Sequence, residues 1–104
     1  MIYKNELQQL IDEINNISGF STNQLAHYIA LLKKGEDLLH SIKNVNQNPM
    51  LETWIDMAFE ELNRELNQRL KNQLQGLSPE QQKSEFLYSR SAVTLIFTNI
   101  LMQL

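Results

Sequence analysis

Apolar side chains recur every three or four residues along nearly the whole chain, which is the spacing of one face of an α-helix. In the first segment this apolar face contains Tyr3, Leu7, Leu10, Ile14 and Ile17. Ser18 and Gly19 follow, and glycine readily adopts the left-handed conformation that ends many helices. The spacing predicts a first helix over about residues 3–17 and, because later segments repeat it, an all-α protein.

Three further helix starts are marked by residues that cap free backbone amides. The Ser-x-x-Gln pattern of a capping box occurs at Ser21–Gln24 and again at Ser78–Gln81, where Pro79 takes the first helical position. Asn48 followed by Pro49 is typical of an N-cap and the first residue of a helix. We therefore expect further helices over about residues 21–46, 49–75 and 79–103.

Gly35 lies inside the second expected helix and leaves two interpretations open. The helix could end there, because the positive charges of Lys33 and Lys34 suit a helix C-terminus. The apolar spacing, however, continues unbroken from Tyr28 to Val45. This favours a continuous helix, in which Gly35 permits close approach of a neighbouring helix at a cost of about 1 kcal/mol relative to alanine.

The third expected helix, which should stop at Gly76, carries a ladder of leucines four residues apart: Leu62, Leu66, Leu70 and Leu74. At this step each leucine lies about 40° further round the helix than the one before. A two-stranded coiled coil needs alternating steps of three and four, which would place Arg69 and Gln73 on the seam. The ladder therefore predicts oblique packing inside one bundle in preference to pairing with a second chain.

The first half of this helix carries two groups of candidate partner-binding residues. They are the apolar Met50, Trp54 and Met57 and the acidic Glu52, Asp56 and Glu60. Aromatic side chains most often serve a core, and charged ones most often lie on a solvated helix face. As functional surfaces, the apolar group would bind a partner or a second copy of the chain. The acidic group would bind a basic protein or imitate the phosphates of a nucleic acid.

The second half of the last expected helix is apolar on almost every side. Val93, Phe97, Ile100 and Leu104 keep helical spacing, while Leu95 and Met102 fall on other faces. Its β-branched residues could form a strand by propensity, but no other segment offers a pairing partner. We expect this helix to lie centrally in the core or to be covered by a second subunit.

Composition narrows the function classes. A formal net charge of -3 and scattered basic residues do not suit a nucleic-acid-binding protein. The chain has no cysteine, which excludes disulfides and thiolate metal sites and is compatible with a cytoplasmic setting. Residues 92–104 form the longest apolar segment, too short and too polar to span a bilayer, and the first residues do not read as a signal peptide.

Few residues suggest catalysis or metal binding. Asp37 and His40 share a helical face, but a metal site needs three or four convergent ligands. With three glycines there is no glycine-rich phosphate loop, and no serine occurs in a nucleophile-elbow pattern. We expect no cofactor, no small-molecule substrate and no enzymatic activity.

The sequence thus predicts a single helical domain over residues 1–104, folded as a bundle of four main antiparallel helices. By elimination, we expect a small cytoplasmic, non-catalytic protein–protein interaction module of the inhibitor, immunity, adaptor or chaperone type, from a bacterium or a phage. One alternative is a structural homodimer that associates through its C-terminal helix and the side of Met50, Trp54 and Met57. Another is a helical metal-binding protein or enzyme that uses dispersed carboxylates together with Asp37 and His40.

Overall fold

The structure, a computed structural model, describes residues 2–18, 21–72 and 74–104, which form four α-helices and one short π-helical segment. These elements are α1 (Ile2–Asn15), α2 (Thr22–Val45), α3 (Pro49–Arg64), η1 (Glu65–Arg69) and α4 (Pro79–Gln103). None of the described residues lies in a β-strand, so the predicted all-α fold is confirmed. Within the same residues, no helix is both long enough and apolar enough to cross a membrane.

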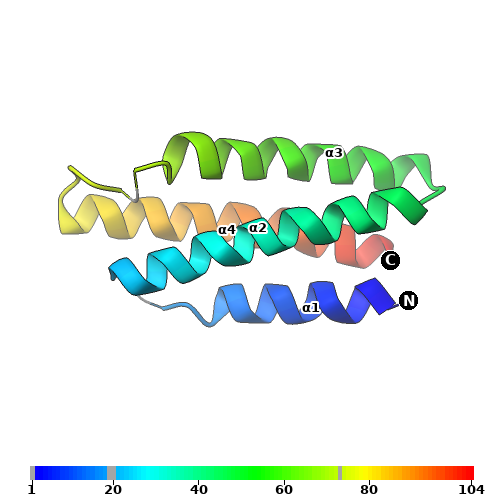
Figure 1. The fold of residues 1–104 in the computed structure, drawn as a ribbon, viewed down its shortest axis with the longest axis horizontal. Helices are drawn as coiled ribbons and strands as arrows, with labels where there is room; N and C mark the ends of the chain where they lie inside the picture. Colours follow the sequence, from blue (N-terminus) through cyan, green and yellow to red (C-terminus); the bar gives the residue numbers. More distant parts are fainter. Residues whose placement is uncertain (1, 19–20, 73) are drawn as a thin grey trace.

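Consecutive helices run in opposite directions along one long axis (Figure 1). In this arrangement α3 lies opposite α1, while α2 and α4 occupy the two sides between them, so each helix makes its most extensive contacts with two others. The bundle measures 45 × 22 × 17 Å. The predicted antiparallel four-helix bundle is therefore confirmed.

The core is built from one apolar stripe of each helix, as the helical spacing predicts. Its largest buried side chains include Tyr28, Phe86 and Phe97. The rings of Tyr28 and Phe86 meet edge to face, with 5.1 Å between their centroids. This contact joins the first half of α2 to the first half of α4.

Gly35 lies in the middle of an uninterrupted α2, so the prediction of a continuous helix is confirmed. The residue is buried, and a Cβ atom placed on it would come within 2.7 Å of Phe97 Cζ and 3.0 Å of Leu10 Cδ2. A Cβ contact of 2.7 Å is essentially never seen in proteins, and one of 3.0 Å is unusually tight. The missing side chain therefore lets α1, α2 and α4 pack closely at this level.

The predicted helix starts are confirmed in atomic detail. Ser21 and Gln24 form a complete capping box at the start of α2, and Ser78 and Gln81 form another at the start of α4. The side chain of Asn48 accepts a hydrogen bond of 3.0 Å from the amide of the second residue of α3. The predicted stop of the first helix at Gly19 lies outside the described residues.

The third helix is shorter than predicted, because it ends at Arg64 and does not continue to Gln75. In η1 the backbone widens, and the amide of Leu70 donates to the carbonyl of Glu65, five residues back, at 2.7 Å. On a straight helix the leucine ladder would wind by about 120° and carry its last member away from the core. Leaving the helix at η1 allows both Leu70 and Leu74 to be buried.

The leucine ladder consequently packs within the bundle. Leu62, Leu70 and Leu74 are buried, and Leu66 packs against the core from its edge. Arg69, which would have interrupted a coiled-coil seam, forms ion pairs inside the chain with Glu65 and Glu85. Gln73, the second residue off the seam, lies outside the described residues.

Candidate protein-binding surface

The structure divides the predicted apolar group on α3 into a core residue and two exposed ones. Trp54 is half-buried and packs against the core, where it helps to hold α3 on the bundle. Met50 and Met57, by contrast, are 67% and 46% exposed. The two thioethers are therefore the part of this group that is available to another molecule.

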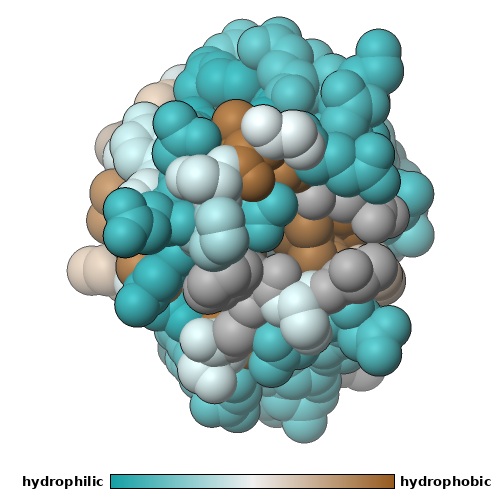
Figure 2. Space-filling view, turned by 90° about the vertical axis from the view of Figure 1, so that its left-hand side faces the viewer, coloured by the Kyte–Doolittle hydropathy of each residue, from teal (hydrophilic) through white to brown (hydrophobic). Residues whose placement is uncertain are grey.

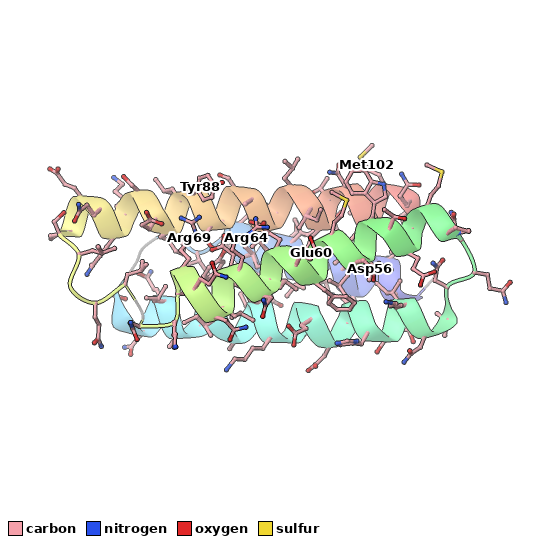
Figure 3. All side chains as sticks on the ribbon, turned by 90° about the horizontal axis from the view of Figure 1, so that it is seen from above. Asp56, Glu60, Arg64, Arg69, Tyr88 and Met102 are labelled. Atoms are coloured by element: carbon pink, nitrogen blue, oxygen red, sulfur yellow. The ribbon has the colours of Figure 1, made fainter. Side chains whose placement is uncertain are left out.

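One of the three acidic residues on α3 is already engaged in an ion pair within the chain. Asp56 accepts a hydrogen bond of 2.7 Å from Lys43 of α2, and this bond raises the pKa of the lysine. Glu52 and Glu60 are exposed, and no cation of the described residues forms an ion pair with either. Figure 3 shows Asp56 and Glu60 along α3, with Arg64 further along the same helix.

Exposed apolar residues of α4 form a second surface, of which the sequence analysis placed Leu95 and Met102 away from the apolar stripe but did not identify Tyr88. Tyr88, Leu95 and Met102 are 60%, 64% and 77% exposed. Part of the hydrophobic surface seen end-on in Figure 2 lies along its left edge, on the side of α4. No charged side chain occurs in residues 91–104, so this half of α4 presents an uncharged outer face.

This finding corrects one expectation about the last helix. α4 is not central in the core, because only one of its sides is fully buried. That side carries Phe86, Ser89, Val93, Phe97 and Ile100. The alternative expectation, that a second subunit covers the helix, is not tested by a single chain and stays a prediction.

Tyr88 marks the boundary between the exposed face of α4 and η1. The guanidinium of Arg69 lies over its ring, 4.3 Å from the centroid, an arrangement that favours a cation. Arg69 also forms ion pairs with Glu65 of η1 and Glu85 of α4. Figure 3 labels Arg69 and Tyr88 on the two neighbouring elements, which these contacts hold together.

A polar network in the core joins η1, α2 and α4. The side chains of Glu65 and Ser89 are completely buried, and the Tyr28 hydroxyl lies 2.7 Å from Ser89 Oγ. Glu65 Oε1 accepts a hydrogen bond of 3.2 Å from Arg69 Nε. Glu65 Oε2 lies 3.0 Å from the same nitrogen but makes no hydrogen bond of its own. The Glu65 and Ser89 side chains are therefore closed to solvent, and one carboxylate oxygen of Glu65 lacks a hydrogen-bond donor among the described residues.

Burial controls the proton affinity of this network. It raises the pKa of the Glu65 carboxyl, because a charged form loses hydration in the core. The hydroxyl of Ser89 and the charge of Arg69 oppose that change without reversing it. Burial raises the pKa of Tyr28 as well, so the phenol stays protonated.

The sequence analysis missed Glu65 as a core residue, although a signal was present. The sequence analysis gave a solvated helix face as the usual place for the charged residues of the third expected helix. The buried residues of α3 and η1 follow one another at steps of 4, 3, 4 and 3: Leu51, Ile55, Ala58, Leu62 and Glu65. A glutamate that continues an apolar stripe at helical spacing is expected to face the core.

The residues considered for metal binding do not converge. The ring of His40 stacks on Phe59, with 4.4 Å between centroids. Asp37 lies instead at a hollow of about 600 Å³ between α2 and η1, whose lining carries charges of both signs. Within the described ranges, no three residues of types that commonly bind a metal lie close enough to hold one.

Two features of this bundle can recognise another molecule by contact: the thioethers of α3 beside the exposed Glu60, and the uncharged outer face of α4. Comparisons of the chain with protein-family models, with curated proteins and with solved structures found no match. The function inferred below therefore depends on these surfaces alone.

Proposed function

We propose that this chain is a non-catalytic protein-binding module that docks its partner on α3. The observation that carries the proposal is the exposure of Met50 and Met57 on a rigid helix, beside Glu60. Methionine side chains are flexible and polarizable, and they adapt to the surface of a partner. Exposed large apolar side chains with a charged rim are typical of interaction sites.

The partner that fits this surface is a protein that carries an apolar side chain next to lysine or arginine. Glu60 is exposed on α3 and pairs with no cation of the described residues, so it is available to a basic group at the rim of an interface. Such rim charges mainly raise the association rate, and salt screens them. A cytoplasmic inhibitor, immunity, adaptor or chaperone role is compatible with this chemistry and with the absence of cysteine.

Binding should be tested by capture from native lysate on immobilised wild-type protein, followed by purification of the captured protein and titration. Met57→Glu places a charge in the centre of the docking surface and should weaken binding at least tenfold. Val45→Ser is the matched control, because Val45 is an exposed apolar residue at the end of α2, outside the surface. Trp54 is unsuitable as a probe, since it also packs against the core.

A charge reversal tests the proposed chemistry of the partner. Glu60→Lys should weaken binding and reduce its sensitivity to salt, because the attraction to a basic rim is lost. A purified partner that binds Met57→Glu and Glu60→Lys as tightly as wild type would show that α3 is not the docking surface.

A further inference from the structure

The outer face of α4 has a regular pattern that differs from the leucine ladder. Its residues lie at steps of 4, 3, 4, 3 and 4: Ser84, Tyr88, Ser91, Leu95, Thr98 and Met102. Alternating steps of this kind are the 3.5-residue repeat of a coiled-coil seam. Large and small side chains alternate along the seam, and its three large members are the exposed residues of α4 described above.

An antiparallel α4 from a second copy matches this pattern in a single register. If Leu95 packs against Ser91 of the second copy, the two-fold axis lies level with Val93. The same axis then places Tyr88 against Thr98 and Met102 against Ser84 of the second copy. Every large side chain meets a small one, which is the arrangement that fills space between two helices. A parallel pairing would set large residues against large ones and small against small.

The charges of α4 also favour a second copy. The residues that flank the seam are uncharged apart from Glu85, which is paired within the chain to Arg69. In the antiparallel register Glu85 lies near Asn99 of the second copy, so no like charges meet. An isologous interface brings the same surface from both copies together and therefore suits an uncharged, self-complementary face. The one cation in contact with the seam, Arg69 over the ring of Tyr88, is already paired within the chain with Glu65 and Glu85.

We propose that α4 is a homodimerisation helix, which pairs antiparallel with α4 of a second copy about a two-fold axis level with Val93. The seam shares no residue with the docking surface on α3, so either proposal can fail without the other. A dimer of this kind carries two copies of the α3 surface. It would bind a multivalent partner more tightly than one copy does, through an increased effective concentration.

Cross-linking through introduced cysteines tests both the dimer and its register, since the natural chain has none. Ser84→Cys and Met102→Cys replace exposed residues that face each other across the proposed interface. Two copies of Ser84 would lie about 27 Å apart, the rise of eighteen helical residues. The two variant chains, co-expressed and treated with a short bis-maleimide, should therefore form a covalent dimer that neither chain forms alone.

Two results would overturn the proposal. Cross-linking of each variant with itself would show a parallel or different arrangement. A co-expressed pair that cross-links no more than Val45→Cys, an exposed position outside the seam, would show that the helices do not meet. Circular dichroism of each variant verifies that the helices are intact before treatment.

Discussion

Glu65 shows how burial changes the behaviour of one acid among several similar ones. The acids of α3 and η1 look alike in the sequence, yet Glu60 is exposed while Glu65 is enclosed with Ser89 and Tyr28. Its position at the end of the apolar stripe of α3 is sufficient to predict that Glu65 faces inward. Its partners could not be predicted, because Ser89 and Tyr28 come from helices whose register and rotation are set by tertiary packing.

Replacing Glu65 by glutamine should make stability less dependent on pH. Burial raises the carboxyl pKa in the folded state above the value of about 4.3 of an unfolded glutamate. The folded state therefore binds the proton more tightly, and stability falls as the pH rises from the unfolded pKa through the folded one. Glutamine places no charge in the core, and Arg69 retains its ion pair with Glu85. We expect Glu65→Gln to gain free energy of unfolding relative to wild type as the pH rises above about 4.3.

Urea unfolding at several pH values from about 4 upwards measures this effect. The gain of Glu65→Gln over wild type should grow with pH from the unfolded pKa until the folded-state pKa is passed, and should then stay constant. Glu60→Gln, on the exposed side of α3, is the control and should follow wild type. A gain that is the same at every pH would contradict the assigned cause.

Gly35→Ala should destabilise the protein even though alanine is the better helix former. The gain in helix propensity is about 1 kcal/mol, whereas a Cβ 2.7 Å from Phe97 Cζ forces a buried ring or a helix to shift. Overpacking of this kind costs about 1–3 kcal/mol. We expect a net loss of about 1 kcal/mol by thermal or urea unfolding.

Two comparisons separate steric overlap from a general effect on α2. Lys34→Ala changes the exposed neighbouring residue and should leave stability almost unchanged. Combining Gly35→Ala with Phe97→Leu should cost less than the sum of the two single changes, because the smaller side chain removes the closest contact. If the losses of stability of the two single variants were fully additive, the ring of Phe97 would not be what a Cβ at residue 35 overlaps.

At the scale of the elements, the capping residues predicted where the helices begin, but the residues at the end of α3 did not predict where that helix stops. Capping residues such as Ser21 and Ser78 lie next to the amides they satisfy, so the sequence shows them directly. The end of α3 is different, because polar residues continue to Gln75 with no break in helical propensity. The helix widens at η1 so that Leu70 and Leu74 can be buried, and this is a tertiary requirement.

The chain leaves η1 through two left-handed residues, Leu74 with φ 61° and Gly76 with φ 84°. Leu74 keeps this unfavourable conformation while its side chain is buried. Gly76 has open space around it, since a Cβ there would have no neighbour within 4 Å. Gly76→Ala should therefore cost about 1 kcal/mol from backbone strain alone. Gly76→Asn should cost less, because asparagine tolerates this conformation better.

Urea unfolding of the two Gly76 variants tests this account of the turn. Equal losses for alanine and asparagine would contradict a conformational cause, because neither side chain meets a steric obstacle at its Cβ. If both variants were as stable as wild type, residue 76 would not keep the left-handed conformation in the folded protein.

At the scale of the whole molecule, helical periodicity was sufficient to predict the four-helix bundle. The candidate surfaces were predicted only in part. The exposure of Met50 and Met57 followed from their place away from the apolar stripe of α3, but the half-burial of Trp54 depends on its neighbours. The outer face of α4 was hidden by its overall apolar character, and only the packed bundle shows which of its apolar residues remain outside.

Leu95→Glu should convert a dimer into a monomer without unfolding the bundle. Leu95 is exposed in the single chain, so the charge meets water there. In the dimer the same charge would be buried next to the two-fold axis, opposite Ser91 of the second copy, without a counter-ion. We expect unchanged circular dichroism and a dissociation constant raised by at least a hundredfold. Val45→Glu, at another exposed apolar position, should associate like wild type.

The molar mass in solution tests the account most directly, by size exclusion with light scattering at several concentrations around and above 10 µM. For wild type and Val45→Glu we predict a mass of twice 12.2 kDa, and for Leu95→Glu the mass of one chain. A wild-type mass of one chain at every concentration, or a dimer that survives Leu95→Glu, would contradict association through the outer face of α4.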